Sequence, residues 1–222
     1  MSSMPTYLII PAAGVGARLG RPEPKALVPV AGRPILDWTL DALASISFAG
    51  VVVAAPPGRL ADFEAVVGAR GRVIAGGLTR SASVRRAFEN SGALPGDVVC
   101  VHDAARPLVR GGEAAEVIGA AQRSGAAIAA TPVVDTLKKD DGERVAGTVD
   151  REGVWAAGTP QAFRTEVLRQ ALASGREATD EAALCEALSI PVAVVPVSRL
   201  GFKITTPEDL EIADAILRSR RP

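Results

Sequence analysis

The loop after the first apolar segment of the chain has the residue types of a phosphate-binding site. It spans residues 11–25 and includes the glycines Gly14, Gly16 and Gly20 and the cations Arg18 and Lys25. Glycines let the backbone approach an anion without a Cβ atom in the way, and successive free N–H groups form an anion-binding concavity. We therefore expect a backbone phosphate site to which Arg18 and Lys25 add side-chain charge.

Two common phosphate-binding templates do not describe this loop. The P-loop requires Gly-x-x-x-x-Gly-Lys-Ser/Thr, a pattern that the sequence does not contain. The dinucleotide fingerprint requires Gly-x-Gly-x-x-Gly at the start of a helix, whereas here the third glycine comes one position late, at Gly20. Pro22 and Pro24 also prevent a helix from starting at Gly16. A plain glycine-rich surface loop is the other alternative, and the two cations favour nucleotide binding over it.

Two further segments place polar residues where apolar runs end. Gly77 and Ser83 lie between an apolar run and a helical pattern, and small residues at a helix N-terminus favour a polar or anionic ligand. Asp103 follows the apolar run 98–101. Because Mg²⁺ prefers one or two carboxylates together with substrate phosphates, we expect Asp103 to be a metal ligand. His102 is the only histidine and is assigned no role.

Length and composition favour a soluble cytoplasmic protein. The 222 residues include 25 basic and 25 acidic ones, and this balance argues against a nucleic-acid partner. The sequence shows no secretory pattern at its N-terminus and no apolar stretch of about 18 residues, so we expect no membrane partner. Cys100 and Cys185 are far apart and are expected to be reduced thiols.

Apolar runs typical of buried strands alternate with helical patterns. The expected strands are residues 8–10, 51–54, 72–74, 98–101, 127–131 and 192–197. The expected helices are residues 34–45, 60–67, 80–90, 113–124, 165–173, 180–188 behind Thr179 as N-cap, and 207–219 behind Thr206. This alternation predicts an α/β, Rossmann-like fold with a largely parallel sheet and helices on both faces. Ligands bind at the carboxyl ends of such strands.

The segment 133–155 breaks the alternation. Asp141-Gly142, flanked by β-branched residues, is a strong hairpin signal. Because an isolated hairpin is only marginally stable, we interpret this segment as an arm that reaches a second subunit, with a solvated surface hairpin as the alternative. We expect one domain over residues 1–222, with a dimerisation arm at about 133–155, and a homodimer.

The motifs together resemble a family of nucleotidyltransferases. Pro-Ala-Ala-Gly-x-Gly-x-Arg-x-Gly with Pro-Lys begins the series, and Gly-Gly-x-x-Arg-x-x-Ser-Val and four later motifs follow in order over residues 7–218. The pattern resembles the sugar-nucleotide-type nucleotidyltransferases and, more narrowly, the 2-C-methyl-D-erythritol 4-phosphate cytidylyltransferase family. The resemblance implies transfer of CMP from CTP to a methylerythritol phosphate in non-mevalonate isoprenoid synthesis, with Mg²⁺ as cofactor.

The resemblance also implies roles for individual residues. The catalytic cations would be Arg18, Lys25 and Lys203. The nucleotide would be bound by Ala12, Ala13, Gly14, Gly16, Gly77, Ser83 and Asp103. The sugar phosphate would be bound by Arg106, Thr136, Arg151, Thr159 and Thr179, of which Thr136 and Arg151 would come from the neighbouring subunit. The chain departs from some members at Leu78, where they have a polar residue.

The residues favour an electrostatic mechanism without a general base. A phosphate monoester is largely dianionic at pH 7, so one of its oxygens can attack the α-phosphorus of CTP directly as pyrophosphate leaves. Positioning and charge neutralisation would then supply the catalysis. Two alternatives remain. One is a ribitol 5-phosphate cytidylyltransferase of the same fold; the other, from a different class, is a non-catalytic or NAD-binding Rossmann module.

Overall fold

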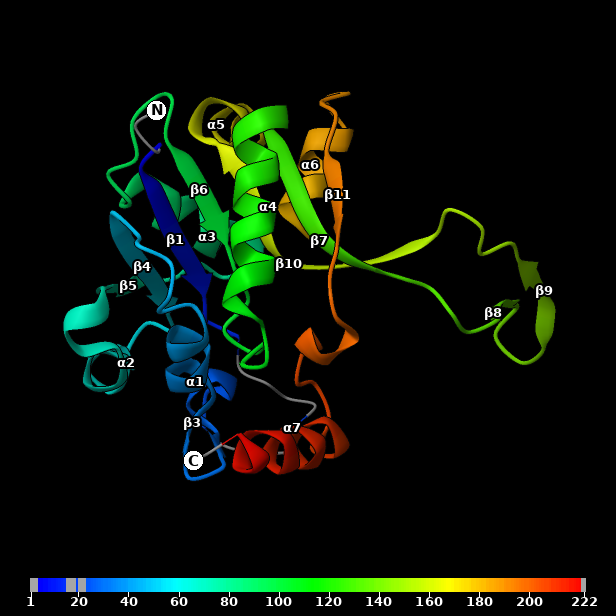
Figure 1. Cartoon of the computed structure of the whole chain (residues 1–222), viewed down its shortest axis with the longest axis horizontal. Coiled ribbons are helices and arrows are strands. Elements are labelled where there is room, and N and C mark those ends of the chain that lie inside the picture. The colour runs from blue at the N-terminus through cyan, green and yellow to red at the C-terminus, as the bar shows by residue number, and fades with distance from the viewer. Residues whose placement is uncertain (1–3, 15–18, 20–22, 221–222) are drawn as a thin grey trace.

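A seven-stranded sheet forms the centre of the described part of the chain (Figure 1). The computed structural model describes residues 4–14, 19 and 23–220. The strand order is β11-β7-β10-β6-β1-β4-β5. The strands are β1 (Thr6–Pro11), β4 (Gly50–Ala55), β5 (Arg72–Ala75), β6 (Val98–Val101), β7 (Ala126–Pro132), β10 (Trp155–Arg164) and β11 (Ala193–Pro196). Strand β10 runs antiparallel to β6 and β7, and the other neighbours in this sheet are parallel.

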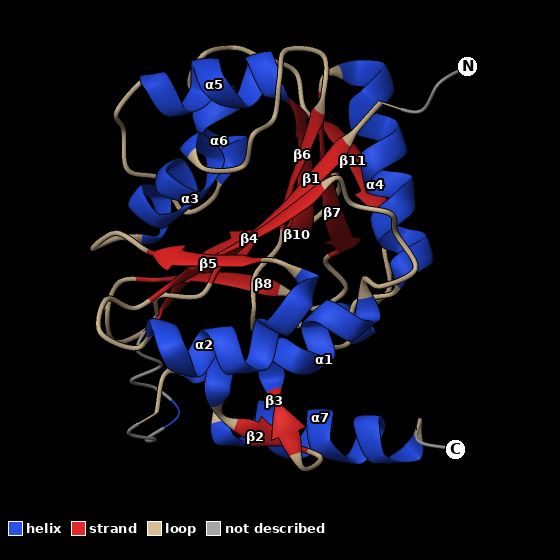
Figure 2. Ribbon diagram, turned by 90° about the vertical axis from the view of Figure 1, so that its left-hand side faces the viewer, coloured by secondary structure: helices blue, strands red, loops and turns tan. Residues whose placement is uncertain are grey.

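Helices cover both faces of the sheet (Figure 2). They are α1 (Ile35–Ala42), α2 (Leu60–Val67), α3 (Arg80–Glu89), α4 (Gly111–Ser124), α5 (Thr165–Ala173), α6 (Glu181–Glu186) and α7 (Pro207–Ser219). The 3₁₀ turns are η2 (Lys25–Leu27), η3 (Gly68–Arg70) and η4 (Arg199–Gly201). Leu8 and Ile10 of β1 pack with α1, α2 and α4, whereas Ile9 between them packs with α3, α5 and α6. This alternation is the period of two expected of a strand that is buried on both faces.

A third apolar cluster attaches α7 below the sheet. It joins α7 to a short hairpin of β2 (Pro29–Val30) and β3 (Arg33–Pro34) through Val30, Ile204 and Leu217, among others. Thr206 caps α7: its side chain accepts from the Asp209 N–H, and the Asp209 carboxylate accepts from the Thr206 N–H. This capping box fixes the start of α7 and the segment before it, and Lys203 lies in that segment.

The expected arm is a hairpin that extends away from the body. Strands β8 (Leu137–Asp140) and β9 (Val145–Val149) pair antiparallel, and Gly142 in their turn has φ 101°. Figure 1 shows the hairpin far from the central sheet, at the end of two extensions from β7 and β10. No helix of the described residues is long and apolar enough to cross a membrane.

The predicted α/β fold, with its largely parallel sheet and two helical layers, is confirmed. The expected strands and helices are present with small shifts at their ends, but the cap of α6 was wrong, and β10 and the short hairpin of β2 and β3 were not expected. Asp180 rather than Thr179 caps α6, because the Asp180 side chain accepts from the Ala183 N–H. Strand β10 was not expected, because Gly158, Thr159 and Pro160 interrupt its apolar pattern.

Candidate active site

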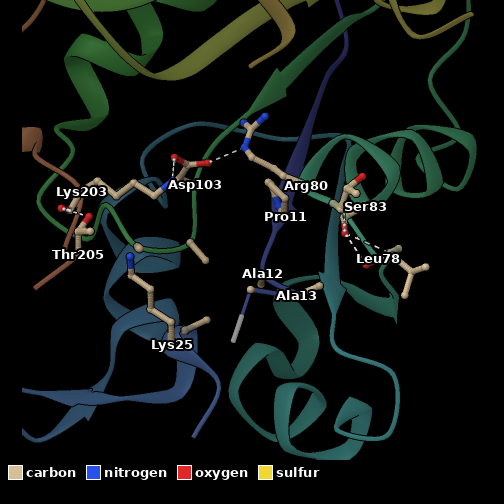
Figure 3. Close-up of a pocket in the computed structure, with 16 residues that line it drawn as sticks. Pro11, Ala12, Ala13, Lys25, Leu78, Arg80, Ser83, Asp103, Lys203 and Thr205 are labelled. Atoms are coloured by element: carbon tan, nitrogen blue, oxygen red, sulfur yellow. Dashed lines mark hydrogen bonds and ion pairs between the residues drawn. The ribbon is translucent and has the colours of Figure 1, made fainter. Parts of the chain in front are cut away.

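A cavity of about 320 Å³ opens at the carboxyl ends of β1 and β6 and at the start of α3. Its lining brings together most of the residues predicted to bind a nucleotide or to act on it, Ala12, Ala13, Gly14, Lys25, Gly77, Ser83, Asp103 and Lys203. Figure 3 shows these side chains and small backbone segments around one space. Gly16 and Arg18 lie outside the described residues.

One wall of this cavity is a tight turn before α3. The Gly77 N–H donates to Ser83 Oγ at 3.0 Å, and the Ser83 hydroxyl donates to the Thr79 carbonyl at 2.9 Å. Thr79 also caps α3 by accepting from the Ala82 N–H. These bonds hold the backbone of the turn against the first turn of the helix, so the wall is preformed. Leu78 lies on the same wall with its side chain fully exposed.

A side chain at position 77 would not fit this turn. A Cβ atom on Gly77 would lie 2.4 Å from the Ala82 Cβ. We expect Gly77→Ala to lower the free energy of unfolding by about 1–3 kcal/mol, as overpacking does elsewhere. Chemical denaturation measures this loss. Gly112→Ala, where a Cβ atom meets nothing within 4 Å, is the control, and equal stability of the two variants would contradict the expected clash.

Asp103, directly beyond β6, is surrounded by cations. Its Oδ2 lies 2.9 Å from Lys203 Nζ and 3.7 Å from Arg106 Nε, and its Oδ1 accepts from Arg80 Nε at 3.2 Å. Burial alone would raise the pKa of Asp103, but the charges of Arg80 and Lys203 lower that pKa well below its ordinary value. The carboxylate is therefore ionised at any physiological pH and holds Lys203 at the cavity.

Arg80 and Glu181 are site residues that the sequence-based predictions did not include. The Arg80 Nη1 and Nη2 atoms donate to the two carboxylate oxygens of Glu181 at 2.8 and 3.0 Å. Burial raises the pKa of Glu181 from its ordinary value, while Arg80 opposes this shift. Arg80 belongs to the Gly-Gly-x-x-Arg-x-x-Ser-Val motif named above. Glu181 gave no signal by its type alone, because an acid in the first turn of a helix is ordinarily solvated.

A second cavity, of about 310 Å³, adjoins the first through Lys203, which lines both. Its lining includes Arg106 and Thr159, two of the residues predicted to bind a sugar phosphate. The Thr159 Oγ1 accepts from the Asp103 N–H at 3.0 Å, and Arg106 Nη1 donates to the Gly201 carbonyl at 2.9 Å. The two cavities thus meet at Lys203, which Asp103 contacts in the first cavity.

Three predicted residues are not in either cavity. Thr136 and Arg151 lie in the extended arm, where both are exposed and Arg151 donates to the Val134 carbonyl. Thr179 is exposed in the loop before α6. Their contribution therefore depends on another copy of the chain or on movement of that loop.

His102 lies beneath the site and is completely buried. Its Nε2 atom lies 3.3 Å from the Arg106 carbonyl. Burial lowers the pKa of His102 to about 4, although Asp103 opposes the shift. The ring is therefore neutral near pH 7, and an Nε2–H group can donate to the carbonyl that precedes Pro107.

A sequence model of the 2-C-methyl-D-erythritol 4-phosphate cytidylyltransferase (IspD) family matches residues 6–219. The chain belongs to this family. The protein of that name from Thermus thermophilus is 47% identical over 219 residues, which cover 97% of this chain and 98% of the relative. The Prochlorococcus marinus cytidylyltransferase is 42% identical, with 96% and 99% coverage. The crystal structure of the Thermus thermophilus enzyme superposes with a TM-score of 0.84 at 45% identity, covering 97% of this chain and all of the other.

Membership of the cytidylyltransferase family confirms the resemblance predicted from the motifs. It also confirms the prediction of an enzyme of the nucleotidyltransferase class. The matches agree with the methylerythritol prediction and not with the ribitol or Rossmann alternative. The family match spans both cavities and the arm.

Proposed function

We propose that this protein transfers CMP from CTP to 2-C-methyl-D-erythritol 4-phosphate in isoprenoid precursor synthesis, releasing pyrophosphate. One observation carries the proposal beyond family membership: two adjoining cavities share a single ammonium group, that of Lys203. A transferase that joins two phosphorylated reactants needs two sites with positive charge where they meet. Lys203 has that position.

CTP would occupy the cavity between the loop after β1 and the start of α3. Ala12 and Ala13 lie on one side of this space and Ser83 on the other (Figure 3), and a flat base would bind between them. Lys25, also in the lining, would receive the triphosphate together with Gly16 and Arg18 of the same loop.

The methylerythritol phosphate would occupy the second cavity. Arg106 and Thr159 in its lining would bind the phosphate and sugar hydroxyls. Thr179 would contribute from the loop before α6. Thr136 and Arg151 would enter from the arm of a second subunit, because in their own subunit the arm carries them away from the body.

The reaction itself requires no general base. A dianionic phosphate oxygen of the second substrate attacks the α-phosphorus of CTP, a new P–O bond forms, and the bond to pyrophosphate breaks with its electron pair. Lys203 offsets the repulsion between the two anions, and Arg18 and Lys25 stabilise charge on the triphosphate. Each of these groups would act through its positive charge and would move no proton.

Asp103 does not have the surroundings of a resident metal ligand. Both of its carboxylate oxygens contact cations, and Mg²⁺ on either oxygen would lie beside Arg80 or Lys203, whose charge repels it. Across the described residues, no group of three His, Cys, Asp or Glu side chains could hold a metal. We propose instead that Mg²⁺ is bound by the phosphates of CTP and enters with that substrate, so the predicted ligation by Asp103 is not part of this proposal.

The arm also supports a homodimer. Val134, Val145 and Trp155 are exposed apolar residues of this arm, and a two-stranded hairpin is marginal unless its side chains find a partner. We further propose a cytoplasmic location, because Cys100 and Cys185 are both free thiols.

A pyrophosphate-release assay tests the proposed reaction. Each of the four nucleoside triphosphates is combined with methylerythritol phosphate or with ribitol 5-phosphate. We expect turnover with CTP and methylerythritol phosphate and with no other pair. Turnover confined to CTP and ribitol 5-phosphate would replace the acceptor, and binding of NADH without pyrophosphate release would replace the enzyme class.

A further inference from the structure

Glu181 is a buried charge that the proposed reaction does not use. It is the first residue of α6 and is completely buried. An ionised carboxylate is costly to bury unless it is paired and hydrogen-bonded. Both Glu181 oxygens accept from Arg80, so the charge is retained through one bidentate pair. Its place beside the active site suggests a use beyond packing.

Hydrogen bonds on either side of Glu181 fix the start of α6. Gln161 of β10 donates through Nε2 to Asp180 Oδ2 at 2.8 Å and accepts through Oε1 from the Ala182 N–H at 3.2 Å. The other Asp180 oxygen accepts from the Ala183 N–H. These bonds fasten the start of α6 to the central sheet, so the Glu181 carboxylate has a fixed position.

Arg80 links the fixed Glu181 carboxylate to Asp103 in the cavity. Each of its three guanidinium nitrogens donates to a carboxylate oxygen, two to Glu181 and one to Asp103. All three nitrogens are therefore already engaged by two acids, and we expect Arg80 to act through these acids rather than on substrate phosphate. Figure 3 shows Arg80 and Lys203 approaching Asp103 from opposite sides.

We infer that Glu181 and Arg80 are positioning residues for Lys203, acting through Asp103. The four side chains alternate in charge and come from α6, α3, the end of β6 and the segment before α7. Without Glu181, Arg80 would no longer be held in place, and Asp103 would lose the fixed contact at Oδ1 that sets the position of its carboxylate. The ammonium group would then leave the place where the two cavities meet. The inference rests on the proposed role of Lys203.

Glu181→Gln tests this inference, because the amide has the shape of the acid but not its charge. We expect kcat to fall by about 10²-fold, the cost of misplacing a reacting group by roughly 1 Å. The KM values for CTP and methylerythritol phosphate should change by less than about threefold, since no substrate contact is removed. Glu186→Gln removes the same charge from an exposed position of the same helix and should leave kcat unchanged.

A double-mutant cycle separates positioning from a general structural effect. If Glu181 acts through Lys203, Glu181→Gln should cause no further loss in a Lys203→Ala background. An additive loss, or wild-type kcat in folded Glu181→Gln, would overturn the inference. Wild-type turnover of Lys203→Ala would instead overturn the proposed role of Lys203 and this inference with it.

A second variant covers the case in which Glu181→Gln does not fold. Arg80→Gln/Glu181→Gln replaces the buried ion pair by two neutral amides, an exchange that proteins often tolerate. It should fold, with the same reduced kcat and the same lack of further loss in the Lys203→Ala background. Wild-type kcat in this double variant would also overturn the inference.

Discussion

Lys203→Ala is expected to lower kcat by about 10²- to 10³-fold, the loss found when one electrostatic contact to a transition state is removed. Lys203 lines both cavities and contacts Asp103, so its charge lies where the attacking phosphate and the α-phosphate of CTP would meet. The fold should survive, because Asp103 still contacts Arg80 and Arg106. Steady-state kinetics with both substrates, together with a thermal melt, measures the effect.

Lys25→Ala should give a similar loss through its effect on the triphosphate. Arg123→Ala is the matched control, because it removes an exposed cation of α4 that lines neither cavity. Wild-type turnover in Lys203→Ala, or an equal loss in Arg123→Ala, would show that the cavity cations do not carry the catalysis.

Mixing two inactive variants should restore activity if the arm completes the site of another subunit. Arg151→Ala alone is expected to lower kcat/KM for methylerythritol phosphate by about 10²-fold, as the loss of a charged hydrogen bond to substrate would. A dimer of one Arg151→Ala subunit and one Lys203→Ala subunit has one intact site, formed by the arm of the second and the body of the first. After unfolding and joint refolding, activity should reach about one quarter of wild type, because half of random dimers are mixed.

The same experiment excludes other arrangements of the arm. If Arg151 acted within its own subunit, every site would lack one of the two residues and the mixture would stay inactive. Arg151→Ala mixed with itself after the same treatment is the control for refolding. A monomer in sedimentation that keeps full activity at high dilution would contradict the shared site directly.

The sequence predicted the elements that have a local signal. The capping box at Thr206 and Asp209 lies within four residues of chain and fixed the start of α7 correctly. The hairpin signal at Asp141 and Gly142 is equally local, and β8 and β9 flank it. Strand β10 has no such signal, because its period of two is broken at Pro160 and its partners β6 and β7 precede it in the chain.

The site could be predicted as a set of residues but not as an arrangement. Motif order identified Lys25, Asp103 and Lys203, and the fold brings them to one cavity. The pairing of Arg80 with Glu181 joins residues 101 positions apart in the chain. Because the partner of a buried charge is set by tertiary packing, no local pattern could show that Asp103 is held by cations from both sides.

The irregular pairing of β10 with β7 separates the arm from the catalytic body. Residues 155–157 pair with β7 in one register and residues 161–163 in another, with the register shift between Ala157 and Gln161. Residues 161–163 of β10 thus hold Gln161 and, through it, the start of α6. This pairing does not depend on residues 155–157, which lead to the arm. Lengthening or shortening the hairpin tip should therefore change which subunits can assemble without moving Asp103 and Lys203 in the body. Arms exchanged between relatives would alter pairing preference separately from substrate preference only where Thr136 and Arg151 are kept.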